Sequence, residues 1–152
     1  ITQEPLESGL YYIEIEEGTG VQAFTEYVAD IEYTIELVDG TVLSTSNREL
    51  AKNNDVYRED IIYGPIRVGV GYTGVPGLDE GLTYMKENGT SKMIMTSDLN
   101  GLGGNTSGLS GPYSTHIYTV KLINAFNEPE EFQTAQIVSW LVDNEIENDW
   151  AK

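Results

Sequence analysis

Cysteine is absent from this chain of 152 residues, which excludes a disulfide framework, a thiolate zinc site and a cysteine nucleophile. Basic residues are also scarce, because 8 Lys and Arg stand against 25 Asp and Glu and give a net charge of -17. A surface of this charge repels phosphate backbones and anionic membranes, so nucleic acid is not an expected partner. No apolar run approaches the roughly 18 residues that a membrane helix needs.

The first residues of the chain give a little more information. Residues 1–4 have neither the basic nor the apolar region of a signal peptide. Because the first residue is Ile1 rather than methionine, we expect a trimmed form of a longer product. The sequence is compatible with a signal peptide or a lipid anchor that has been removed. Contact with a membrane is expected only through such an anchor. The length and a hydrophobic content of 39% favour one core.

Alternating apolar residues predict several β-strands. In residues 10–16, Tyr11, Ile13 and Ile15 alternate with polar or aromatic neighbours, so one face is expected to be buried. Residues 27–46 have the pattern of an antiparallel hairpin that turns at Asp39 and Gly40. Three further strands are predicted over residues 63–71, 92–96 and 115–126.

Helices and long loops occupy the remaining segments. Leu78, Leu82 and Met85 have the spacing of one face of a short helix, which Asn88 and Gly89 can terminate. A second amphipathic helix is predicted to run to about residue 144. Residues 47–62 have the pattern of an inserted loop with a helical turn, and the glycine- and serine-rich residues 97–114 that of a flap. Strands mixed with few helices indicate an α+β fold with an antiparallel sheet.

Four stretches, taken in order, are similar to one known family. They are IEYTIELVDGTVLSTS, GPIRVGVG, VPGLDEGLTYMKENGTSKMIM and THIYTVKLINA. Their order and spacing resemble the FKBP-type peptidyl-prolyl cis-trans isomerase domain over residues 10–126. The resemblance implies a twisted antiparallel sheet of five or six strands that wraps a short helix, with an added C-terminal helix. We therefore predict an FKBP-like domain over residues 1–126 and a helical extension over residues 127–152.

The resemblance also implies a set of site residues. Tyr33 and Tyr118 match positions of the catalytic pocket, the second with a hydroxyl where the family commonly has phenylalanine. The substrate-binding positions that it implies are Leu43, Ser44, Ile66, Val75, Leu78 and Leu102. Ser44 stands in place of the pocket aspartate, Leu78 in place of the tryptophan under the groove, and the segment near Leu102 lacks the flap tyrosine.

The function implied by the resemblance is cis-trans isomerisation (rotamase activity) of X-Pro bonds in polypeptide clients, without a cofactor. Rotation of a prolyl amide must break amide resonance, and an apolar pocket favours the twisted, less polar amide. The three replaced groups motivate an alternative, a non-catalytic peptide-binding or chaperone module. The opening segment ESGLYYIEIEEGTG resembles FKBP-like lipoproteins of the bacterial envelope, which implies export.

Other candidate sites have weaker support. His116 is the only histidine, and without cysteine or a second imidazole a structural role is the better interpretation. Asp79 and Glu80 lie in the first turn of the predicted helix, where carboxylates complement the helix dipole. Asp98 and Asn100 suggest calcium, but the other ligands of a calcium loop are missing. We predict no metal site.

Overall fold

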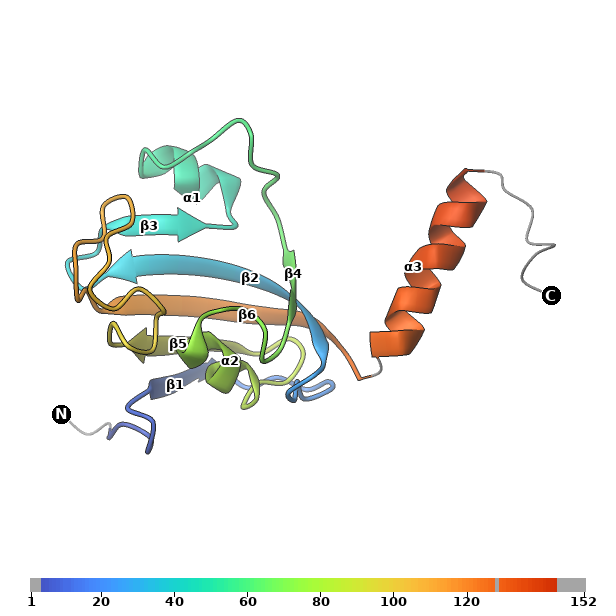
Figure 1. Cartoon of the computed structure of the whole chain (residues 1–152), viewed down its shortest axis with the longest axis horizontal. Coiled ribbons are helices and arrows are strands. Elements are labelled where there is room, and N and C mark those ends of the chain that lie inside the picture. The colour runs from blue at the N-terminus through green and yellow to red at the C-terminus, as the bar shows by residue number, and fades with distance from the viewer. Residues whose placement is uncertain (1–3, 128, 145–152) are drawn as a thin grey trace.

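A single antiparallel sheet forms the body of the protein. The computed structural model describes residues 4–127 and 129–144. Its sheet has the strand order β1-β5-β6-β2-β3, with β4 paired to β2 beside β3, and every pairing is antiparallel. The elements are β1 (Tyr11–Glu16), β2 (Val28–Leu37), β3 (Val42–Thr45), α1 (Arg48–Asn53), β4 (Ile66–Gly69), α2 (Pro76–Leu82), β5 (Thr90–Met95), β6 (His116–Phe126) and α3 (Pro129–Asp143). The predicted α+β class is confirmed (Figure 1).

The turns form where the sequence predicts them. Gly40 has a φ of 91°, and the Thr41 amide donates to the Asp39 carboxylate at 2.9 Å, which closes the hairpin between β2 and β3. Asn88 has a φ of 72° and its amide donates to the carbonyl of Leu122 at 2.7 Å. The Asn88-Gly89 turn therefore aligns the start of β5 against β6.

Alternation along the strands separates the core from the outer face. On β6 every second residue from His116 to Leu122 is buried, as the sequence pattern indicates. On β1 the core side carries Tyr12, which pairs with the buried Met93 of β5. Ile15 lies in the apolar phase of that strand, yet its side chain is 57% exposed. The shift of register between Glu14 and Glu16 shows that β1 is irregular here.

Helix α2 lies across the sheet and approaches β5 closely (Figure 1). A methyl group added at Gly77 would come within 2.6 Å of the Met95 sulfur, and one at Gly81 would overlap Met93. Leu78 and Leu82 of the same helix are buried in the core. The two glycines, four residues apart, therefore allow the helix backbone to rest directly on the methionines of the sheet.

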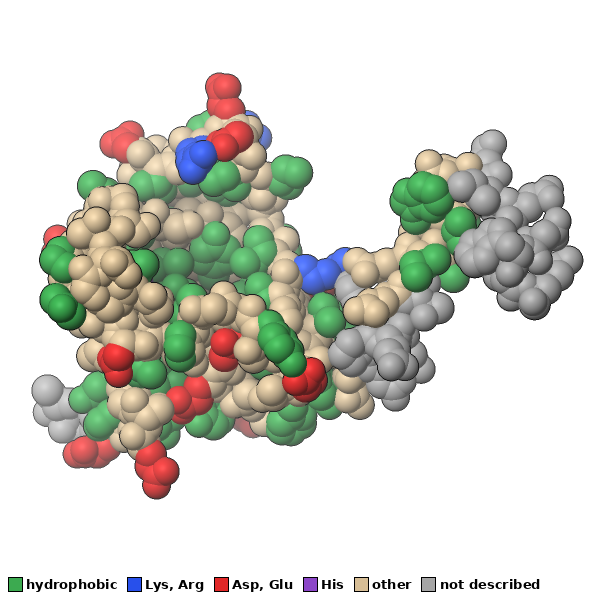
Figure 2. Space-filling model, in the orientation of Figure 1, with side chains coloured by type: hydrophobic (Ala, Val, Ile, Leu, Met, Phe, Trp, Pro, Cys, Tyr) green, Lys and Arg blue, Asp and Glu red, His purple; other side chains and the backbone are tan. Residues whose placement is uncertain are grey.

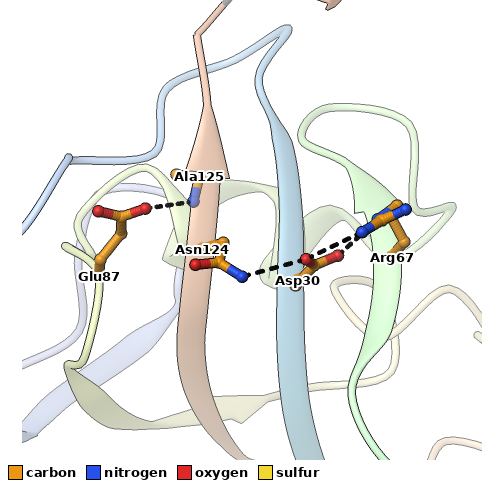
Figure 3. A network of polar contacts seen from close by, with 5 residues as sticks. All are labelled: Asp30, Arg67, Glu87, Asn124 and Ala125. Atoms are coloured by element: carbon orange, nitrogen blue, oxygen red, sulfur yellow. Dashed lines mark hydrogen bonds and ion pairs between the residues drawn. The ribbon is translucent and has the colours of Figure 1, made fainter. Parts of the chain in front are cut away.

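Two carboxylates connect neighbouring strands and loops, and Figure 3 shows the contacts of Asp30 and the contact of Glu87 with Ala125. Asp30 of β2 accepts from Arg67 of β4 at 2.8 Å and from Asn124 of β6 at 3.3 Å, which links three neighbouring strands. Glu87 accepts from the Ala125 amide at 2.8 Å and, with its other oxygen, from the Val21 amide at 3.0 Å. These carboxylates join segments that are far apart in the sequence.

Helix α3 follows β6 and stands apart from the sheet in Figure 1. It ends at Asp143, close to the predicted boundary, and the Trp140 side chain is 57% exposed. Within residues 4–127 and 129–144, no helix is both long and apolar enough to cross a membrane.

Candidate functional site

A groove of about 590 Å³ opens on the face of the sheet that carries α2. Figure 2 shows this face hollowed between α1 and α2, with hydrophobic side chains gathered in the hollow. We call it the groove and define it by its lining residues: Ile35, Leu43, Ser44, Asp55, Val56, Tyr57, Arg58, Val75, Asn100, Leu102, Ser107, Gly108, Leu109, Ser110, His116 and Tyr118. It is therefore built from strands β2, β3 and β6, the loop after α1, the residue before α2, and residues 97–114.

Five of the eight predicted site residues line the groove together. They are Leu43, Ser44, Val75, Leu102 and Tyr118. Their positions in the sequence are distant, and the antiparallel pairing of β2 with β3 and β6 brings the strand residues side by side.

Tyr33 reaches the edge of this set through its hydroxyl, which lies 3.3 Å from the Ser44 Oγ. Its ring is half-buried against the core and is not among the lining groups. Tyr118 is buried on the neighbouring strand, and burial, with a smaller effect of Tyr33, raises its pKa to about 12. The Tyr118 hydroxyl therefore remains protonated and can donate a hydrogen bond at neutral pH.

The structure places the other two predicted residues outside the groove lining. Leu78, on the buried side of α2, is only 6% exposed and packs in the core. Ile66 lies on β4 opposite Ile31 and is 37% exposed. β4 pairs with the first half of β2, whereas β3, which lines the groove, pairs with the second half.

The segment before α2 is held in place by Asp79. Its Oδ1 accepts from the Gly71 amide at 2.9 Å and from the Thr73 amide at 3.1 Å, which orders the connection between β4 and α2. The Val75 amide, which the family resemblance suggests as a ligand contact, donates to the Thr73 hydroxyl at 3.1 Å. The carboxylate near the helix start thus serves the geometry of the groove wall.

The flap, residues 97–114, is closed at its base by Asn100. Its side-chain amide donates to the Ser114 carbonyl at 2.8 Å, and its Oδ1 accepts from the Leu102 amide at 3.0 Å. Asn100 is buried and lines the groove. From the sequence alone, Asn100 is only a weak candidate for a calcium ligand. The part of the chain that the structure describes contains no cluster of three His, Asp or Glu residues able to hold a metal ion.

Sequence reasoning missed the wall that the inserted loop provides. Asp55, Tyr57 and Arg58 follow α1 and line the groove. Arg58 forms an exposed ion pair with Asp60 at 2.7 Å, and the Tyr57 ring stacks on Tyr63 with centroids 5.5 Å apart. The segment shows no periodic apolar pattern, so nothing local in the sequence marks its place.

His116 is the second missed residue. It is 5% exposed, lines the groove beside Tyr118, and its Nε2 lies 2.9 Å from the Ser110 Oγ of the flap. The alternation of β6 places His116 and Tyr118 on the same face, and this was the available signal.

Comparison with known proteins supports the fold. No family model matches the chain. It is 29% identical over 116 residues to the protein named probable FKBP-type peptidyl-prolyl cis-trans isomerase FkpA of Neisseria meningitidis serogroup B. That match covers 76% of this chain, which spans only 38% of the length of that relative.

Two solved structures resemble the described fold. FkpA from Escherichia coli superposes with a TM-score of 0.65 at 22% identity, covering 82% of this chain and 51% of that one. A peptidyl-prolyl cis-trans isomerase from Pseudomonas syringae pv. tomato gives a TM-score of 0.65 at 18% identity, covering 82% of this chain and 81% of that one. The chain has the FKBP fold. The resemblance predicted from the sequence is confirmed.

Proposed function

We propose that this FKBP-type chain is a peptidyl-prolyl cis-trans isomerase that acts on X-Pro bonds of polypeptide clients. The observation that carries the proposal is the convergence of Leu43, Ser44, Val75, Leu102 and Tyr118 on one groove. The name of the meningococcal relative supports the same activity. In this proposal Tyr33 and Tyr118 are the catalytic tyrosines, and Leu78 and Ile66 support the groove from the core and from β4.

The chemistry requires little from the protein. The barrier to rotation is about 18–20 kcal/mol, because amide resonance must be broken. The twisted amide is less polar than the planar one, so an apolar wall of Leu43, Leu102 and the Tyr118 ring stabilises it relative to water. The tyrosine hydroxyls are available to donate to a peptide carbonyl that the groove holds.

The decisive experiment is exchange NMR on a short Leu-Pro peptide, with and without the protein. We expect the protein to accelerate exchange between the cis and trans signals. Tyr118→Leu should reduce kcat/KM by about tenfold or more, which corresponds to at least about 1.4 kcal/mol of transition-state stabilisation. Tyr72→Leu is the matched control, because Tyr72 is exposed and its hydroxyl bonds to Glu26 outside the groove.

Absence of acceleration at high protein concentration would refute the isomerase assignment. The replacement of the family aspartate by Ser44, which bonds only the Tyr33 hydroxyl among the described side chains, favours one alternative. In it the chain is a non-catalytic module that binds extended peptides. Peptide binding seen as chemical-shift changes at Leu43 and Leu102, without exchange, would identify that case.

The location and the domain boundary belong to the same proposal. We infer that the protein is exported to the bacterial envelope, with residues 1–126 as the isomerase domain and residues 127–152 as a helical extension. Cell fractionation of the native organism tests the first point. Limited proteolysis tests the second, since cleavage should begin between β6 and α3.

A further inference from the structure

His116 is buried at the groove, and the proposed isomerisation assigns it no part. The His116 Nε2 lies 2.9 Å from the Ser110 Oγ, and both side chains are almost fully buried. The other ring nitrogen, Nδ1, is buried without a hydrogen-bond partner among the described residues. A buried polar atom left unpaired costs free energy, so a histidine here does not serve stability alone.

Ser110 closes the tip of the flap. The amide of Ser107 donates to the Ser110 carbonyl at 3.0 Å, and the Ser110 amide donates to the Ser107 carbonyl at 2.8 Å. Between them, Gly108 has a φ of 54° and Leu109 is 66% exposed at the mouth of the groove. We call residues 107–110 the tip turn. Within the described part of the chain, the bond from Ser110 to His116 is the only side-chain hydrogen bond between the tip turn and the sheet.

We propose that His116 is a positioning residue: its neutral ring holds the tip turn over the groove through Ser110, so that Leu109 and the flap wall contact a bound peptide. The inference rests on the proposed function, because it assigns the flap to substrate binding. It also predicts that binding depends on the protonation state of one side chain.

The surroundings of His116 favour the neutral ring. Its partners across the sheet are Met95 on β5 and Leu37 on β2, and neither carries a charge. Tyr118, on the same strand, has its ring centroid 6.4 Å away and stays protonated. Burial lowers the pKa of His116.

Two charged groups line the same groove from the loop after α1. They are Asp55 and Arg58, and Arg58 is paired with Asp60. Neither forms a hydrogen bond or ion pair with the ring among the described contacts. A protonated ring would therefore carry a buried charge without a counter-ion, and opening the tip turn would allow water to solvate it.

The sign of the pH effect follows from this. With the tip turn closed, His116 binds a proton less readily than a solvated histidine, whose pKa is about 6.5. Opening of the tip turn is therefore favoured as the pH falls below about 6.5. The equilibrium constant for opening rises by at most about tenfold for each unit by which the pKa of His116 in the open state exceeds its pKa in the closed state.

The experiment uses the fact that His116 is the only histidine. Its ring signals can be followed between about pH 5 and pH 8 by long-range proton–nitrogen NMR, with amide hydrogen exchange of residues 107–110 and with KM and kcat for a Leu-Pro peptide. We expect exchange at the tip turn to accelerate and KM to rise by about threefold or more on acidification, with kcat changing less. Far-UV circular dichroism verifies that the fold persists.

Three variants separate positioning from a structural role. His116→Gln can still reach Ser110 with its amide but does not titrate, so it should keep a low KM that no longer depends on pH. Ser110→Ala and His116→Leu should raise KM and tip-turn exchange at every pH. If His116→Leu fails to fold, Ser110→Ala alone decides, because it leaves the sheet unchanged.

Two results would overturn the inference. One is a His116 that titrates at its ordinary pKa without any change in residues 107–110, and the other is a Ser110→Ala variant identical to the wild type in KM and exchange. If the wild type shows no turnover at any pH, the proposed activity fails, and the NMR and exchange data alone decide whether His116 positions the flap of a binding groove.

Discussion

The contact between Asp30 and Arg67 gives the sharpest test of how β4 is held on the sheet. Arg67 donates to one oxygen of Asp30 at 2.8 Å through Nε and to the other at 3.3 Å, while Asn124 donates from the opposite side. The Asp30 side chain is 12% exposed and the Arg67 side chain 51%. Exposed ion pairs contribute about 0.2–1 kcal/mol, and hydrogen bonds to charged groups contribute more when one partner is buried.

We therefore expect a coupling free energy of about 1 kcal/mol between the two side chains at neutral pH. A double-mutant cycle with Asp30→Asn, Arg67→Met and both together measures it. Unfolding by urea should be followed by far-UV circular dichroism. Lys86→Met controls for the general effect of removing a positive charge from an acidic protein, because Lys86 is exposed on the surface.

The coupling must also depend on pH. The hydrogen bond from Arg67 lowers the pKa of Asp30, with smaller contributions from Asn124 and the Arg67 charge, against burial. A carboxyl whose pKa is depressed on folding stabilises the protein above its unfolded value, about 3.9, and loses that contribution as the pH falls through the folded value. A coupling near zero at neutral pH, or one that is unchanged at about pH 2, would refute this reasoning.

Three further outcomes are expected. Glu87→Ala should lower the free energy of unfolding by about 2–3 kcal/mol, because it leaves the buried Ala125 amide without its acceptor. Glu87→Gln should lower it by about half as much, and urea unfolding measures both. Gly81→Ala should lower it by about 1–3 kcal/mol, since the added methyl overlaps a methionine of β5; an unchanged urea midpoint would show that the methionine yields freely. Trp150 lies outside the described residues, so the third test uses a Trp150→Phe variant. Its tryptophan emission should change little when a proline peptide binds, because Trp140 lies on α3, away from the groove, and a large response in a titration would contradict that arrangement.

Local patterns were sufficient for most of the secondary structure. Alternation predicts β2, β5 and β6 because each has one face against the core, and Asn88-Gly89 and Asp39-Gly40 predict their turns because those residues tolerate positive φ. β1 was less readable, since an aromatic residue on each face makes the alternation ambiguous and Tyr12 rather than Ile15 faces the core.

The groove shows where sequence reasoning reached its limit. The family resemblance indicated Leu43, Val75 and Tyr118, which the sheet brings together. It also indicated Leu78 for the groove, whereas the close approach of α2 to β5 places that side chain in the core. The depth of a side chain depends on how near two elements pack, which no single segment encodes.

The sequence by itself determined the antiparallel α+β class, the order of the elements, the acidic surface and the lack of any thiol chemistry. These follow from composition and from the period of the side chains, which act within a few residues. Only the tertiary structure decided that the loop after α1 forms one wall of the groove, that Asn100 closes the flap, and that His116 meets Ser110. Those contacts depend on where loops without periodic patterns come to rest against the sheet, and long-range packing rather than local preference sets that position.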